Sequence, residues 1–147
     1  MESSPAKHQP IGDRAVSFIL DTDICSAYLK GNHQVGNRME QYGGGLHVSA
    51  ITAAELFTWV LRRKAAPARL QGLLDLLKNV ALLDVNYDVS RTFGEIRACQ
   101  LDRGTVTPEI DLLIAATAIH YGLTLVTHNV SDFVNVPGLQ ICDWLAD

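Results

Sequence analysis

Short apolar runs alternate with longer helical stretches along most of this chain, and no other feature of the sequence constrains its fold as strongly. Four runs rich in valine, isoleucine and leucine have the composition of buried strands, namely residues 15–20, 46–48, 81–85 and 123–127. Between them, the spacing of apolar residues predicts helices over 24–31, from 51 onward, and over 70–77, 88–102 and 107–121. Strands that alternate with helices form parallel sheets. We therefore expect an α/β fold, a three-layer α/β/α sandwich around a central, mainly parallel sheet of four to five strands.

Capping residues mark several of the expected boundaries. Thr107 is placed as the N-cap of the helix at 107–121, with Pro108 at the first helical position and Glu109 in the first turn. Gly104 and Gly122 follow the last periodic residues of the two late helices, where glycine is the usual stop. A triple glycine at 43–45 predicts a turn before the second strand.

Length and charge limit the classes of function. A chain of 147 residues fits one domain, and we expect a flexible leader at residues 1–14 followed by a domain over 15–147. The net charge of -4 argues against a simple module that binds nucleic acid through a positive surface. A metal-dependent nuclease is compatible with it, because bound cations reverse the local sign of a carboxylate cluster.

The cysteines and the hydropathy pattern bear on location. Cys25, Cys99 and Cys142 are odd in number and widely spaced, which suits neither a disulfide framework nor a zinc site. No apolar run approaches the roughly 18 residues of a membrane span, and no signal peptide pattern is found at the start. We expect a cytoplasmic protein without a membrane partner.

Acidic residues occur at strand ends and inside apolar helical segments. Asp21 directly follows the first strand and Asp132 follows the fourth, at the edge where open α/β sheets bind ligands. Glu55 and Asp111 lie among small or apolar residues, in ITAAEL and PEIDLLIAATA. None of these segments contains a Lys or Arg, and unpaired buried charge is costly unless a metal ion binds it. Hard oxygen ligands favour Mg²⁺ or Mn²⁺ over zinc.

Each of these residues also has an ordinary structural explanation. Asp21 could cap the helix that follows it, and Glu55 could close a capping box in the segment TAAE. Asp111 lies one turn inside its helix, where the helix dipole favours an acid. Asn129 and Asp132 are common turn formers.

The order of these segments resembles the PIN-domain family over nearly the whole chain, from about residue 18 to residue 144. The segment LDTD at 20–23 resembles the family's first acid, ITAAEL at 51–56 its second and PEIDLLIA at 108–115 its third. LVTHNVSDF at 125–133, VPGL at 136–139 and the pair at 143–144 resemble the closing segment of VapC-type toxins of type II toxin–antitoxin systems.

The resemblance implies a catalytic metal site built from Asp21, Glu55 and Asp111, with a fourth acidic position. We assign Asp132 to that position and Asn129 as a neutral helper, while Asn129 itself stays open as the alternative. Supporting residues around the site are implied to be Thr22, Asp23, Ser26, Thr127 and Asn129.

The resemblance further implies a PIN-like fold and a Mg²⁺- or Mn²⁺-dependent endoribonuclease. Its implied substrate is RNA, with the anticodon loop of tRNA as a specific hypothesis. Its implied partners are a VapB-like antitoxin and a second copy of the chain in a homodimer. The alternative is a PIN-like module that has lost catalysis and only binds RNA or protein.

A basic patch lies just beyond the helix that carries Glu55. Arg62, Arg63, Lys64 and Arg69 are candidate RNA contacts. The competing explanation is a solvated helix end whose cations suit its dipole.

Overall fold

The structure is a computed structural model that describes residues 16–147. It has one sheet of five strands in the order β3-β2-β1-β4-β5, and every neighbouring pair is parallel. The strands are β1 (Phe18–Leu20), β2 (Leu46–Ser49), β3 (Ala81–Leu83), β4 (Thr124–Val126) and β5 (Ile141–Cys142). The predicted α/β/α architecture with a central parallel sheet is confirmed. The predicted leader at residues 1–14 lies outside the described residues.

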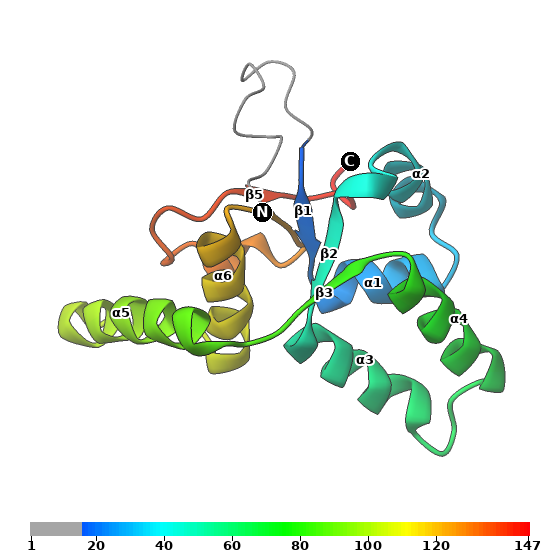
Figure 1. The fold of residues 1–147 in the computed structure, drawn as a ribbon, viewed down its shortest axis with the longest axis horizontal. Helices are drawn as coiled ribbons and strands as arrows, with labels where there is room; N and C mark the ends of the chain where they lie inside the picture. The colour runs from blue at the N-terminus through cyan, green and yellow to red at the C-terminus, as the bar shows by residue number, and fades with distance from the viewer. Residues whose placement is uncertain (1–15) are drawn as a thin grey trace.

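In residues 16–147, six α-helices and two 3₁₀-helices connect the strands (Figure 1). The α-helices are α1 (Thr22–Leu29), α2 (His33–Gln41), α3 (Ala50–Leu61), α4 (Pro67–Lys78), α5 (Tyr87–Arg103) and α6 (Glu109–Tyr121). The 3₁₀-helices are η3 (Gly43–Gly45) and η4 (Val130–Phe133). None of the helices over residues 16–147 is long and apolar enough to cross a membrane.

Successive side chains of the strands point to opposite faces of the sheet, and they contribute to two apolar clusters, one on each face. Leu20 of β1 and Val126 of β4 pack with α1, α2, α3 and α4. Ile19 and Leu125, the neighbours of those residues, face the other side and pack with α6, η4 and part of α5. Because β1 lies in the middle of the sheet and is covered on both faces, all three of its residues are buried.

The structure adds two elements that the apolar pattern did not predict. Helix α2 buries only Val35 and Met39, and the Asn32 side chain caps it by accepting a hydrogen bond from the Val35 N–H over 2.9 Å. Strand β5 is two residues long, too short for a recognisable run. The triple glycine forms η3 rather than an open turn. A Cβ on Gly45 would lie 2.5 Å from the Val16 carbonyl oxygen, so only glycine fits that close approach.

One predicted cap is wrong and two stops are confirmed. Helix α6 begins at Glu109 with Pro108 as its N-cap, not Thr107. Thr107 is instead buried, and its hydroxyl oxygen accepts a hydrogen bond from Gln100 Nε2 over 2.9 Å. The Thr107 hydroxyl therefore makes a tertiary contact with Gln100 and does not cap α6, as its position in the sequence had predicted. Gly104 and Gly122 end their helices with φ of 73° and 67°.

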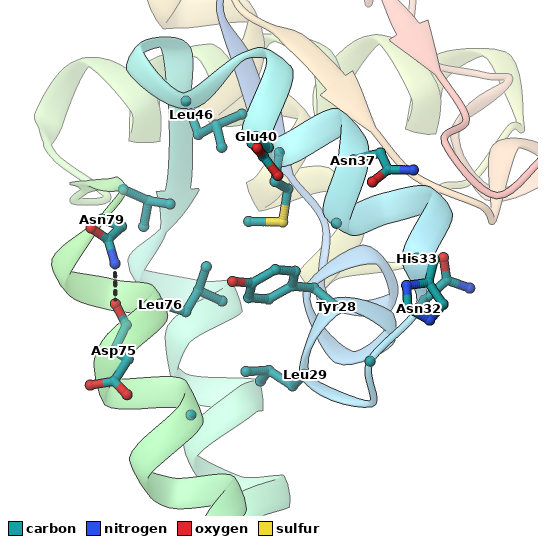
Figure 2. A pocket seen from close by; sticks show the side chains of 16 residues that line it. Tyr28, Leu29, Asn32, His33, Asn37, Glu40, Leu46, Asp75, Leu76 and Asn79 are labelled. Carbon is teal, nitrogen blue, oxygen red and sulfur yellow. Dashed lines mark hydrogen bonds between the residues drawn. The ribbon is translucent and has the colours of Figure 1, made fainter.

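A cavity of about 800 Å³ opens between α1, α2 and α4 (Figure 2). Tyr28, Met39 and Leu76 supply apolar wall, while Glu40 and Asp75 supply polar edges. None of the predicted acidic site residues lines this cavity, so the candidate chemistry lies elsewhere.

Candidate active site

Asp21 stands at the carboxyl end of β1 and begins α1 as its N-cap. One carboxylate oxygen accepts a hydrogen bond from the Thr22 N–H over 2.8 Å, and the other accepts one from the Thr127 hydroxyl over 2.9 Å. The residue is only 5% exposed. The capping role expected as an alternative is therefore real, but it uses one oxygen and leaves the other directed at the end of β4.

Burial and neighbouring charge raise the pKa of Asp21 from 3.8 to about 6. Burial is the largest cause, followed by the negative charge of Asp23 and, with a smaller effect, that of Asp111. The hydrogen bonds from Thr127 and Thr22 act the other way, because they favour the ionised carboxylate. A cation nearby would stabilise the ionised form of this carboxyl group against burial and the neighbouring negative charges.

Glu55 reaches the same region from α3. The N-cap of α3 is Ser49, whose hydroxyl accepts a hydrogen bond from the Ile51 N–H over 3.1 Å, so Glu55 lies well inside the helix and the capping-box alternative is wrong. Its carboxylate accepts a hydrogen bond from the Thr22 hydroxyl. This hydrogen bond ties the beginning of α1 to α3.

Asp111 and Asp132 approach from the other side of the sheet. Asp111 lies in the first turn of α6, and Asp132 lies in η4 after β4. The pKa of Asp111 is raised, first by burial and then by the negative charges of Asp132, Glu55 and Asp23 in that order. Acids from four separate segments therefore lie within electrostatic reach of one another.

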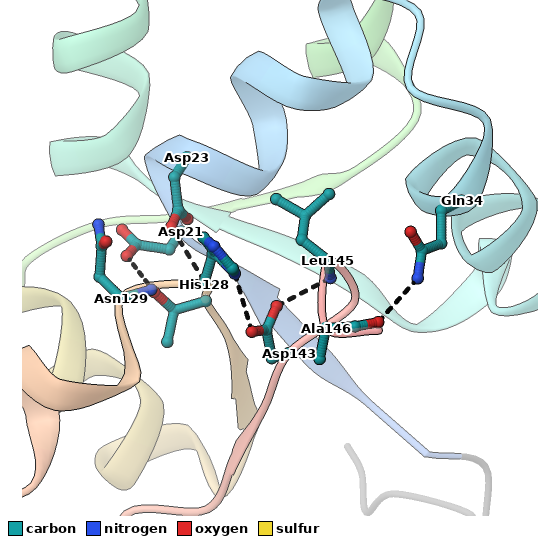
Figure 3. Close-up of polar contacts among 9 residues, drawn as sticks. Asp21, Asp23, Gln34, His128, Asn129, Asp143, Leu145 and Ala146 are labelled. Carbon is teal, nitrogen blue, oxygen red and sulfur yellow. Dashed lines mark hydrogen bonds and ion pairs between the residues drawn. The ribbon is translucent and has the colours of Figure 1, made fainter.

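Asp23 completes the acidic cluster, which we define as Asp21, Asp23, Glu55, Asp111 and Asp132. Its Oδ2 accepts a hydrogen bond from the His128 N–H over 3.0 Å, whereas its buried Oδ1 has no partner among the described residues (Figure 3). Burial is the main reason that its pKa is raised. An orphaned carboxylate oxygen in a buried position is the kind of group that a cation or a bound water would satisfy.

The donor set of the acidic cluster fits Mg²⁺ or Mn²⁺. Its ligands are hard carboxylate oxygens, and no sulfur or imidazole is needed. As the side chains stand, no three His, Cys, Asp or Glu residues of the described part of the chain have the geometry to hold an ion together. To coordinate an ion, some of these carboxylate side chains would therefore have to rotate. Water would fill the remaining ligand positions, since Mg²⁺ usually retains several water ligands.

A family model describes the same stretch of chain: the model of the PIN domain matches residues 18–139. The chain belongs to the PIN domain family. This PIN domain is 30% identical over 131 residues to ribonuclease VapC2 of Haemophilus influenzae, covering 88% of this chain and 99% of that one. It is 28% identical over 130 residues to the tRNA(fMet)-specific endonuclease VapC of Salmonella typhimurium, covering 88% and 98%.

A solved structure agrees with this assignment. The crystal structure of DNA-bound VapBC from Salmonella typhimurium superposes on the PIN domain with a TM-score of 0.82 and 28% identity, covering 88% of this chain and 98% of that one. The predicted PIN-like fold and the resemblance to VapC-type proteins are confirmed.

The remaining predicted residues of the PIN domain lie around the acidic cluster in different ways. Thr22 and Thr127 donate directly to its carboxylates. The Ser26 hydroxyl donates to the Asp23 backbone oxygen over 3.0 Å, so it supports α1 and not a carboxylate. The Asn129 N–H donates to the Thr127 hydroxyl oxygen over 3.1 Å, which links it to Asp21 through Thr127, and the same backbone group helps to lower the pKa of Asp23.

Sequence reasoning missed a pair beside the acidic cluster. His128 Nδ1 lies 2.9 Å from Asp143 Oδ2, and Asp143 Oδ1 accepts a hydrogen bond from the Leu145 N–H over 2.8 Å (Figure 3). The pair links the C-terminal segment to the end of β4. The signal in the sequence was a histidine next to Thr127 at a strand end.

The predicted basic residues lie at the far end of α3. Arg62, Arg63 and Lys64 line a cavity of about 390 Å³ together with Trp59. Arg69, at the start of α4, packs with its guanidinium carbon 4.5 Å from the centre of the Trp59 ring. They are not part of the acidic cluster.

Proposed function

We propose that this PIN domain is an endoribonuclease of the VapC type that hydrolyses RNA phosphodiester bonds with Mg²⁺ or Mn²⁺. The observation that carries the proposal is the convergence of acids from four segments, expressed in the raised pKa values of Asp21 and Asp111. The names of the two VapC relatives, a ribonuclease and a tRNA endonuclease, support it.

In this proposal Asp21, Glu55, Asp111 and Asp132 hold the metal ion, directly or through water. When bound, the ion would lower the pKa of a coordinated water and neutralise charge on the phosphoryl oxygens. Thr127 and the Thr22 N–H partly offset the effect of burial on Asp21, because hydrogen bonds to a carboxylate favour its charged state. The Thr22 hydroxyl orients Glu55.

Hydrolysis by water determines the ends of the product. No attack by the ribose 2′-hydroxyl is involved, so the proposal predicts 5′-phosphate and 3′-hydroxyl termini. A 2′,3′-cyclic phosphate product would contradict it. Sequencing and end-labelling of the cleaved RNA would decide between the two.

We propose tRNA as the substrate class and a VapB-like antitoxin as the partner. The first rests on the Salmonella relative named tRNA(fMet)-specific, and the second on the solved VapBC complex. An arginine of the antitoxin would match the acidic cluster, since a guanidinium binds carboxylates in a bidentate geometry. We also propose a homodimer and, because Cys25, Cys99 and Cys142 are free thiols, a cytoplasmic location.

Cleavage of purified tRNA with Mg²⁺, with EDTA, and after Asp21→Asn tests the proposal. We expect cleavage only with Mg²⁺ or Mn²⁺, and its loss in the variant. Asp102→Asn is the matched control, because Asp102 is an exposed acid on α5 outside the acidic cluster. An inactive binding module would instead bind RNA and leave it intact under every condition.

A further inference from the structure

The end of α3 carries a concentrated positive charge in a chain whose net charge is -4. Arg62, Arg63 and Lys64 line one cavity of about 390 Å³ with Trp59, and Lys30 and Arg69 lie over the Trp59 ring, so five of the twelve Lys and Arg residues gather here. We call this group the Trp59 pocket, and its cations are Lys30, Arg62, Arg63, Lys64 and Arg69.

Three separate elements build the Trp59 pocket. Trp59 comes from α3, Lys30 caps the end of α1, and Arg69 comes from α4. Lys30 Nζ lies 5.5 Å and Arg69 Cζ 4.5 Å from the centre of the Trp59 ring, both over its face. The clustering of charge is therefore a product of the fold and not only of the run of basic residues at 62–64.

The helix dipole accounts for only part of the pocket. Arg62 is the C-cap of α3 and Lys30 the C-cap of α1, where a helix end favours a cation, whereas Arg69 lies in the first turn of α4, where it does not. Within the described residues the ion pairs are Arg91–Glu95 and His128–Asp143, so none of the five pocket cations has a carboxylate partner there. Cations without a carboxylate partner among the described residues, gathered around one aromatic ring, form a positive patch that attracts an anion.

The pocket and the acidic cluster lie along the same two helices. Helices α1 and α3 pack against each other, and the hydrogen bond from Thr22 to Glu55 joins them at the acidic end. Trp59 follows Glu55 by one turn on the same face of α3, about 6 Å further along the axis. Lys30 lies two turns after Asp23 on α1, about 10 Å away along the axis. Figure 1 shows both helices leaving the strand ends toward α4.

We propose that the Trp59 pocket is an RNA subsite that holds the substrate a short run of nucleotides away from the bond that is cut. The ring of Trp59 would hold Lys30 and Arg69 in place, and Arg62 and Arg63 would bind backbone phosphates beside them. A positively charged groove that follows the backbone is how single-stranded nucleic acid is bound without sequence readout. The inference rests on the proposed function and deepens it, since it assigns the direction in which the RNA leaves the acidic cluster.

The binding of a short, labelled, single-stranded oligoribonucleotide, measured by fluorescence anisotropy over a range of salt concentrations, tests this. All proteins would carry Asp21→Asn, so that the RNA stays intact. We expect Arg62→Gln with Arg63→Gln to flatten the slope of log affinity against log salt by about 0.7 for each phosphate that the protein no longer neutralises. Trp59→Leu keeps an apolar side chain but removes the ring that Lys30 and Arg69 contact, and it should weaken binding roughly 2- to 30-fold.

The control is the double variant Lys78→Gln with Arg103→Gln, which removes the same charge from exposed positions on α4 and α5 outside the pocket. An unchanged salt slope in the Arg62/Arg63 variant, or an equal change in the control, would overturn the subsite. The subsite would also be overturned if the Arg62/Arg63 variant lost its binding of an acidic peptide but kept its binding of the RNA. Cleavage of RNA by the wild-type chain with Mg²⁺ is measured in parallel. If it cleaves while the slope is unchanged, only the subsite is wrong, and if it does not cleave, the proposed nuclease function is wrong.

Discussion

The Thr127 hydroxyl donates a hydrogen bond of 2.9 Å to Asp21 Oδ2, although the two residues are 106 positions apart. Both are buried, and the bond joins the ends of the neighbouring strands β1 and β4. It lowers the pKa of Asp21, against the effect of burial, and so keeps the carboxylate closer to the ionised form that binds a cation.

Replacing Thr127 with valine should weaken metal use. The variant keeps the branched shape but loses the donor, so the pKa of Asp21 rises further and a proton competes better with the ion. We expect the Mg²⁺ concentration for half-maximal cleavage to rise about 10- to 100-fold, as for other losses of a group that orients a ligand. Thr127→Ser retains the hydroxyl and is the control. An unaltered Mg²⁺ requirement in the valine variant would show that the hydrogen bond does not matter for metal binding.

Asp21 should make the metal-free protein less stable as pH rises. Its pKa is 3.8 in the unfolded reference and about 6 in the folded state, so the folded state binds the proton more tightly. The contribution of Asp21 to stability is therefore fully present below pH 4 and is lost as pH rises through 6. Asp21→Asn removes this loss, and we expect it to raise the free energy of unfolding at pH 7.5 by up to about 3 kcal/mol.

Urea denaturation in EDTA at pH 4 and pH 7.5 measures this difference. The gain from Asp21→Asn should be small at pH 4, where the folded wild-type side chain is already protonated. A gain of the same size at both pH values would mean that the charge of Asp21 is not its cause. Added Mg²⁺ should reduce the difference in free energy of unfolding between Asp21→Asn and the wild type at pH 7.5. The reason is that a ligand of the native state stabilises the wild type and not the variant.

Gln100 should be a determinant of stability that the sequence does not suggest. It is 3% exposed, and its Nε2 donates to the Thr107 hydroxyl oxygen over 2.9 Å and to the Asn135 carbonyl over 3.0 Å. These hydrogen bonds link α5 to the segment before α6 and to the segment after η4. Asp111 lies on α6 and Asp132 lies on η4. We expect Gln100→Leu to lower the free energy of unfolding, measured by thermal or urea unfolding, by about 1–3 kcal/mol, since it leaves the buried Thr107 hydroxyl without this partner. Gln71→Leu, on the exposed face of α4, is the control and should cost far less.

His128 should matter less for the acidic cluster than its position suggests. The donor to Asp23 is the backbone N–H of His128, which any side chain retains. The imidazole pairs with Asp143 but is 56% exposed, so the pair contributes little. We expect His128→Ala to lower the free energy of unfolding by less than about 1 kcal/mol and to leave the Mg²⁺ requirement for cleavage unchanged. A large rise in that requirement would assign the imidazole a direct role at the site.

Much of the acidic cluster could be predicted because its members follow strands or interrupt apolar helices. A carboxylate in PEIDLLIAATA or after a buried strand needs a physical reason, and the fold brings those carboxylates together. The exact role of each could not be read from local sequence. Thr52 and Glu55 match a capping box, yet α3 begins earlier at Ser49, and the buried Thr52 hydroxyl has no partner among the described residues.

The sequence alone determined the α/β class, the parallel sheet and the candidate acids, because the pattern of apolar and polar residues along a short segment indicates its secondary structure and its buried face. Only the tertiary structure decided that Thr22 holds Glu55, that Thr127 holds Asp21, and that Lys30 and Arg69 meet over Trp59. Such contacts join residues from different elements, and their formation depends on how helices pack on the sheet. Neither spacing nor composition along the chain contains that information.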